Sequence, residues 1–182
     1  MPKILDNPKE KILSEARFMI KEDGYSKLSM RNLAKSCGIG LGTVYNYFKN
    51  KHSIVLEIIR GDWKEVILKL KDVNKLDKGF EEKMKIIYDA VDNYFSNHMG
   101  IFFEVYKEEK SKPNHNIDSI FGPLYDITEV IIVYHINNGD IQSALNERVL
   151  SKFIVSNMIT IIKSRTFSFE DLICILTSKY SN

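Results

Sequence analysis

The chain has 182 residues, of which 44% are hydrophobic and 27% are charged, and its formal net charge is +2 at pH 7. This composition predicts a globular, soluble protein with a buried core, in one domain or in a small domain joined to a larger one. No apolar run approaches the roughly 18 residues of a membrane span, and the N-terminus lacks the apolar segment of a signal peptide, so we expect a cytoplasmic protein without membrane contact.

The first predicted helix begins after Asn7 and ends at Gly24. Asn7 is a typical capping residue, Pro8 suits the first helical turn, and apolar residues then recur at helical spacing. The second helix is short: Ser29 caps its beginning, and Gly38 supplies the positive φ that ends it.

A third short helix is predicted from about Leu41 to Phe48. Two short helices joined by a tight glycine turn form a helix-turn-helix. Gly40 and Gly42 cost roughly 0.5 to 1 kcal/mol each relative to alanine, which packing or function must offset. We expect that these glycines let the helix backbone approach DNA closely, while Val44 and Phe48 pack on the two preceding helices.

The same helix carries Tyr45 and Tyr47, whose rings can pack and whose hydroxyls can reach phosphate oxygens. Charge supports an anionic partner, because residues 1–51 hold 10 Lys/Arg against 5 Asp/Glu, whereas residues 52–182 hold 16 against 19. The net charges of +5 and −3 favour nucleic acid over membrane as the partner of the N-terminal segment.

The rest of the chain predicts six further helices separated by turn residues. Their approximate ranges are Lys51 to Val73, Phe80 to Asn97, Met99 to Lys110, Ile117 to Asn137, Leu145 to Ile162, and Phe169 to Tyr180. We therefore predict an all-α fold of about nine helices, with a boundary near residue 50.

Metal and catalytic motifs are missing from the sequence. Neither His98 and His135 nor His52 and His115 lie at ligand spacing, and the two cysteines form no metal or disulfide pattern. No nucleophile elbow or phosphate-binding loop occurs either. We predict no metal, no cofactor and no enzymatic activity.

The segment from Ala16 to Lys51, with GYSKLSMRNLAKSCGIGLGTVYNYFKNK at its centre, resembles the DNA-binding head of the TetR family of bacterial transcriptional regulators. Gly-Tyr, Leu-Ala, Gly-Ile, Gly-Thr-Val-Tyr, Tyr-Phe and Lys occur in the family's order and spacing. The match covers about a quarter of the chain. The remainder fits the family in length and helical content, and Asn138-Gly139-Asp140 is similar to a common family turn.

The resemblance implies a DNA-binding domain over 1–50 and an effector-binding and dimerisation domain over 51–182. It implies that the DNA is contacted by Arg31, Leu41, Gly42, Thr43, Asn46 and Tyr47, and that Tyr45 and Lys51 clamp phosphates. Asn46 can pair with adenine, Thr43 offers a hydroxyl or methyl group, and Arg31 suits guanine. At Leu41 many relatives carry lysine, so we expect readout leaning towards A·T.

The last two predicted helices carry apolar surface wider than one core face needs. As in the family, two helices from each subunit can form a four-helix dimer interface. The candidate interface residues are Phe153, Ile154, Met158, Ile161, Phe169, Leu172, Ile173 and Leu176. The alternative is that both helices are simply interior.

In the family, the helices between the head and this interface enclose a ligand cavity. Aromatic walls with a few polar tips suit a mostly apolar small molecule. The candidate pocket residues are Trp63, Tyr88, Phe95, His98, Phe102, Phe103, Tyr106, Phe121 and Tyr125. For each aromatic residue, ordinary core packing is the alternative.

These patterns together predict a homodimeric regulator that binds a palindromic operator in double-stranded DNA and is released by a small-molecule effector. The helix beginning at Lys51 is the expected lever between sensing and DNA binding. Gly61 either softens this lever or serves close packing. Activation rather than repression stays open, and the rival from another class is a helical small-molecule carrier or adaptor without specific DNA binding.

Overall fold

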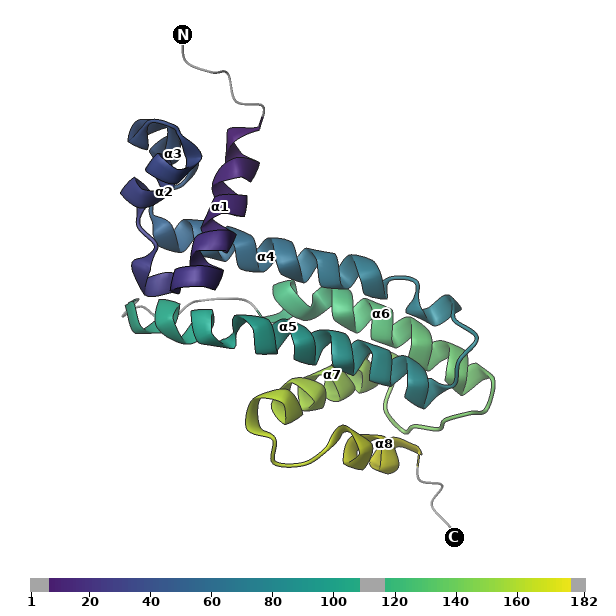
Figure 1. Ribbon diagram of the computed structural model, residues 1–182. Coiled ribbons are helices and arrows are strands. Elements are labelled where there is room, and N and C mark those ends of the chain that lie inside the picture. The colour runs from purple at the N-terminus through teal and green to yellow at the C-terminus, as the bar shows by residue number, and fades with distance from the viewer. Residues whose placement is uncertain (1–6, 109–116, 178–182) are drawn as a thin grey trace. The chain divides into compact units, whose positions relative to one another are not determined.

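The computed structural model describes residues 7–108 and 117–177, without the side chains of Met99, 102–108 and 117–119. Within these ranges the fold is entirely helical, which confirms the predicted all-α class (Figure 1). The α-helices are α1 (Pro8–Asp23), α2 (Met30–Cys37), α3 (Leu41–Tyr47), α4 (Lys51–Leu70), α5 (Phe80–Glu108), α6 (Ile117–Asn137), α7 (Glu147–Ser164) and α8 (Phe169–Thr177). In the described part of the chain, no helix combines the length and apolar character needed to cross a membrane.

The described residues contain eight α-helices rather than the nine expected. The predicted helices Phe80 to Asn97 and Met99 to Lys110 form one continuous helix, α5. No proline lies near the predicted break, and Gly100, two residues after it, costs only about 1 kcal/mol in a helix, which is too little to end the helix. Helix α4 is shorter than expected and is followed by a 3₁₀ turn at Val73–Lys75.

The chain divides into two compact units, each formed by two separate segments. The first unit contains the residues up to Trp63 and the part of α5 from His98 onward. The second contains Lys64–Asn97 and the chain from α6 to the C-terminus. The functional boundary expected near residue 50 stays a prediction.

The core of the first unit lies between α1, α2, α3 and the first half of α4. Asn7 and Ser29 accept hydrogen bonds from the backbone N–H groups of Glu10 and Asn32, which confirms both predicted caps. Each helix of the head contributes buried apolar side chains: Ile12, Leu13, Ala16, Leu33, Ala34, Cys37, Val44, Phe48, Ile54, Val55 and Ile58.

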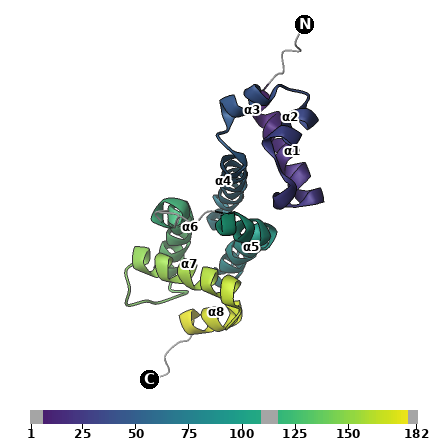
Figure 2. The same ribbon diagram turned by 90° about the vertical axis from the view of Figure 1, so that its left-hand side faces the viewer.

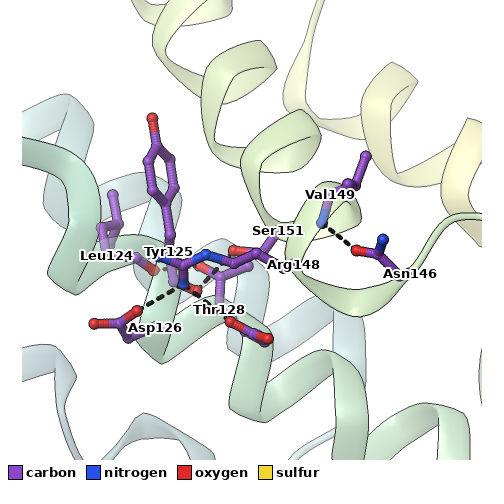
Figure 3. A network of polar contacts seen from close by, with 9 residues as sticks. Leu124, Tyr125, Asp126, Thr128, Asn146, Arg148, Val149 and Ser151 are labelled. Atoms are coloured by element: carbon purple, nitrogen blue, oxygen red, sulfur yellow. Dashed lines mark hydrogen bonds and ion pairs between the residues drawn. The ribbon is translucent and has the colours of Figure 1, made fainter. Parts of the chain in front are cut away.

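The second unit has α6 and α7 side by side, with α8 against α7 (Figures 1 and 2). At this contact Ser151 is fully buried and donates a hydrogen bond of 2.7 Å to the carbonyl oxygen of Tyr125 (Figure 3). On the surface beside it, Arg148 Nη1 lies 2.6 Å from Asp126 and 2.9 Å from Glu129. Polar groups therefore fix the register of two otherwise apolar helices.

Candidate nucleic-acid interface

A tight turn joins α2 to α3. Gly38 has φ 65° and ψ 33°, in the left-handed region that favours glycine, and its N–H donates to the carbonyls of Ala34 and Lys35. The N–H of Ile39 also donates to Ala34, at 3.0 Å. These bonds close the C-terminus of α2 and redirect the chain into α3, so the predicted helix-turn-helix is confirmed.

The two glycines at the beginning of α3 are not required by packing within the subunit. Gly40 is the N-cap, with φ −65°, and no side chain caps the helix. A methyl group on Gly40 would come no closer than 3.7 Å to the Thr43 hydroxyl, and one on Gly42 would meet nothing within 4 Å. The space over this turn is open, and its use for a close approach to DNA stays a prediction.

The side chains of α3 separate into a buried face and an exposed face. Val44 is fully buried and Phe48, just after the helix, is 5% exposed, which confirms their predicted packing. Tyr45 and Tyr47 are 52% and 44% exposed, and Asn46 between them is also exposed. Of the other predicted DNA contacts, Leu41 and Thr43 are half-buried at the beginning of α3, Gly42 is exposed, and Arg31 is exposed on α2.

Lys51, the predicted phosphate clamp, is the first residue of α4. Its ammonium nitrogen lies 4.2 Å from the centre of the Tyr25 ring. The preceding residue Asn50 accepts a hydrogen bond of 2.8 Å from the N–H of Ser53, and the Ser53 hydroxyl lies 3.3 Å from the N–H of Asn50. Helix α4 therefore begins with a cap made of two neutral side chains.

Charged pairs connect α1 to α4 within the first unit. Lys9 lies 2.6 Å from Glu57, and this hydrogen bond and charge raise the pKa of the lysine. Farther along α4, Arg17 Nη1 lies 2.6 Å from Asp62 Oδ2, and the same oxygen is 2.8 Å from His98 Nε2 on α5. Asp62 thus joins three helices, and His98, expected in a ligand pocket, is bonded to this carboxylate.

Gly61 precedes this carboxylate in α4. A methyl group there would lie 3.7 Å from Arg17 Nη2, an ordinary van der Waals distance. Close packing therefore does not explain the glycine. The other interpretation given for Gly61, a softened helix, stays a prediction.

The predicted pocket residues are spread over both units. Trp63 and His98 lie in the first unit, both largely buried. In the second unit Phe95 stacks on Phe121 with ring centres 6.5 Å apart, and Tyr125 is 4% exposed. The predicted residues Phe102, Phe103 and Tyr106 fall outside the described side chains.

Tyr88 lines a surface groove of about 550 Å³ between α5 and the α7–α8 connection. Its ring packs 4.9 Å from that of Phe169, and burial, together with the charge of Asp92, raises the pKa of its hydroxyl. Arg165 pairs with Asp92 at 2.6 Å, and Lys85 with Asp89 at 2.7 Å. This groove is lined by paired charges, unlike the mostly apolar cavity that the family resemblance implies.

Six of the eight predicted interface residues are buried inside the subunit. They are Ile154, Met158, Ile161, Phe169, Leu172 and Ile173, each no more than 4% exposed. Leu176 is half-buried, and Phe153 is 44% exposed. The exposed apolar side chains nearby are others on α6, at the beginning of α7 and on α8: Val130, Val133, Tyr134, Leu145, Val149 and Ile175.

The sequence reasoning missed two residues that the structure places at connecting positions. Asp62 was one acid among many on a long helix, and no local pattern links it to Arg17 or His98. Tyr25 was noticed only as part of the Gly-Tyr motif, and its contact with Lys51 spans 26 positions of the chain. In the described part of the chain, no cluster of three or more potential metal ligands occurs.

The helix-turn-helix matches a family of known proteins. Residues 12–58 match the sequence model described as bacterial regulatory proteins, tetR family. The matched segment holds the helix-turn-helix, so this part of the chain is of the TetR type. Its relatives are transcriptional regulators, not enzymes, in agreement with the sequence prediction.

Two proteins similar to most of this chain come from Bacillus subtilis strain 168. The fatty acid metabolism regulator protein is 24% identical over 149 residues, covering 79% of this chain and 75% of its own length. The HTH-type transcriptional regulator YvdT is 26% identical over 159 residues, covering 86% and 81%.

Solved structures of TetR-family regulators share the fold. A TetR/AcrR-family regulator from Thermobifida fusca superposes with a TM-score of 0.70 at 13% identity, covering 97% of this chain and 100% of its own. The regulator FadR from Bacillus subtilis, solved in complex with stearoyl-CoA, gives 0.63 at 20% identity, with coverages of 93% and 97%.

Proposed function

We propose that this protein is a homodimeric repressor of the TetR type, which a partly apolar small molecule releases from a palindromic operator. Residues 1–50 bind the DNA, and residues 51–182 bind the effector and dimerise. The observation that carries this proposal is the exposed face of α3. On this face two half-exposed tyrosines and an exposed asparagine point to solvent. The opposite face of the helix is buried in the core.

The exposed face gives each predicted contact a chemical role. Asn46 reads adenine through its amide, and Thr43 contacts a base edge with its hydroxyl or methyl group. Leu41 contacts a thymine methyl, so the half-site is A·T-rich, while Arg31 on α2 contacts guanine or phosphate. Tyr47 also contacts the DNA.

Operator selection from random duplexes tests this function directly. The selected sequences should be palindromic, with half-sites one helical turn, about 34 to 36 Å, apart. Affinity should fall with salt on a logarithmic slope of about −5 to −9, as expected for six to ten phosphate contacts. A carrier or adaptor protein would select no sequence and show no such slope.

The effector proposal is supported by the fatty acid regulator among the relatives and by the FadR structure with stearoyl-CoA. We infer that acyl thioesters are the effector class. Titration of the operator complex with acyl-CoA esters of increasing chain length, with free coenzyme A as the control, tests this. Release by long-chain esters alone supports the proposal, whereas no release by any ester contradicts it.

Helix α4 transmits the signal in this proposal. Its first residue is the phosphate clamp, and it is about 30 Å long at 1.5 Å per residue. Asp62 pairs with Arg17 of α1 and His98 of α5. A shift of α5 therefore pulls on α1 and α4 together, and an effector that favours the shifted state lowers DNA affinity by its differential binding energy.

A further inference from the structure

The surface groove of the second unit combines an aromatic floor with charged walls. Its volume of about 550 Å³ lies within the range of small-molecule sites. Tyr88 on α5 and Phe169 at the beginning of α8 are 7% and 3% exposed, and their ring centres are 4.9 Å apart. The floor of the groove is therefore aromatic and is fixed by the core.

The protein already places one of its own cations against this floor. Lys85 Nζ lies 5.1 Å from the centre of the Tyr88 ring and 5.4 Å from that of Phe169, within the range of a cation–π interaction. The same nitrogen is 2.7 Å from Asp89, and this hydrogen bond raises the pKa of the lysine. Ring faces and a carboxylate thus hold a positive charge together at this place.

A second cation borders the groove where α7 ends. Arg165 Nη2 lies 2.6 Å from Asp92, and Nη1 donates a hydrogen bond of 3.3 Å to the Tyr88 hydroxyl. The backbone of Arg165 has φ 52°, in the left-handed region that is strained for a residue with a side chain. The ion pair with Asp92 helps to hold this conformation, and a ligand cation that replaced the guanidinium would let the backbone relax.

The described lining residues carry more negative than positive charge. The carboxylates are Asp89, Asp92 and Glu170, and the cations are Lys85 and Arg165. Glu170 is exposed in the first turn of α8. The additional carboxylate and the negative ring faces both favour a positively charged ligand over an anion.

We propose that this groove binds a flat organic cation, whose ring system lies along Tyr88 and Phe169 and whose charge pairs with Asp92 in place of Arg165. All the residues named for this site belong to the second unit. The ligand class differs from the anionic acyl-CoA esters proposed as effectors, so this is a further site and not another description of the same one.

Titration with a cationic dye tests the site on the full-length protein without DNA. The probe is N-methylacridinium, a flat fluorescent cation, and its matched control is acridine at a pH at which acridine is neutral. The groove variants are Asp92→Asn and Arg165→Gln. Arg148→Gln controls for the loss of one positive charge, because Arg148 pairs with Asp126 and Glu129 of α6, about 25 Å from Arg165 along α7 at 1.5 Å per residue. Thermal unfolding is recorded for each variant.

One dye should bind per subunit, at least about five-fold more tightly than acridine, because only the cation gains from the carboxylates and the ring faces. Asp92→Asn should weaken dye binding about three- to five-fold, the scale of an exposed ion pair. Arg165→Gln should strengthen it about two- to three-fold, because the competing guanidinium is removed. Arg148→Gln should change it less than about 1.5-fold, because salt screens a charge at that distance.

Three results would overturn the inference. Equal affinities for the dye and for acridine would refute a cation site. Equal gains from Arg165→Gln and Arg148→Gln would show that net charge alone attracts the dye. Shifts in the same direction for both groove variants would show that the ion pair only shapes the groove. Because the titration contains no DNA, all three results are independent of the operator proposal.

Discussion

The side chains of α3, together with Phe48 just after it, divide between the core and the proposed DNA contacts. Val44 and Phe48 are closed into the core, while Asn46 and the two tyrosines are open to solvent. Replacing the first pair should therefore cost stability, and replacing the second group should cost affinity without unfolding the head. This division allows base readout to be tested separately from folding.

Asn46→Ala should weaken operator binding by about 1 to 3 kcal/mol and relax selection at one base pair, because an amide that pairs with adenine is lost. Binding to random duplex should stay unchanged, as measured by anisotropy on both probes. Tyr45→Phe is the control, because it removes the hydroxyl of the proposed phosphate clamp, and it should weaken binding to both probes alike. Equal loss on both probes for Asn46→Ala would contradict base readout.

Gly61→Ala tests the softened helix at a single position. The added methyl group lies at an ordinary van der Waals distance from Arg17. The free energy of unfolding should therefore rise by up to about 1 kcal/mol, the difference in helix propensity between glycine and alanine. If flexibility at Gly61 is used for release, the same variant should need more effector to leave the operator. Thermal unfolding and effector titration together check this, and a stabilised protein with unchanged release would exclude the role.

At the level of the helices, capping and periodicity predicted α1, α2 and α3 almost to the residue. Asn7, Ser29 and Gly38 act through neighbours three to five positions away, and such local chemistry is visible in a sequence. The predicted break before Met99 was wrong, because no residue there ends a helix and α5 runs through it. The pair of Asp62 and His98 could not be predicted, since it depends on how α4 packs against α5.

Six of the eight predicted interface residues are buried within the subunit, and the reason is related. Helical periodicity identifies apolar side chains that must be buried, but it does not distinguish burial within a subunit from burial between subunits. Ile154 and Met158 are covered by their own chain, whereas Val149 and Phe153 on the same helix are exposed. Only the packing of α6 on α7 separates the two groups.

The connection of α1, α4 and α5 through Asp62 predicts a loss of coupling. Asp62→Asn keeps the shape but removes the charge that holds Arg17 and His98. The ratio of DNA affinities without and with effector, about 5- to 150-fold for ordinary allosteric coupling, should fall below this range. Operator and acyl-CoA titrations of the variant measure this ratio.

Glu57→Gln is the matched control for this prediction, because it breaks the pair with Lys9 but leaves α5 untouched. Its coupling should stay near that of the wild type. If both variants lose coupling equally, the α1–α4 contact in general matters, and Asp62 has no special role.

For the whole molecule, the exposed apolar side chains of α6 and α7 are the surface that we expect a second copy to cover. Phe153→Asp should yield a folded monomer by sedimentation velocity. Its affinity for the palindrome should fall at least about 100-fold, because one head contacts only one half-site. Far-ultraviolet circular dichroism should stay unchanged.

Ile154→Asp provides the contrast at the neighbouring position. It places a charge in the subunit core, so it should unfold the protein rather than dissociate it. A folded dimer for Phe153→Asp would rule out this surface as the interface.

The first unit is built from two segments that are far apart in the sequence. This restricts where a chimera of two such regulators can be joined. A chimera joined near residue 63 would take α1 and most of α4 from the donor but α5 from the recipient, so the histidine partner of Asp62 would come from the other parent. Chimeras that take both the residues up to Trp63 and the segment beginning at His98 from the donor should fold better than chimeras with a single junction. The exchangeable unit of this protein is defined by contacts in space, and it does not correspond to one continuous segment of the sequence.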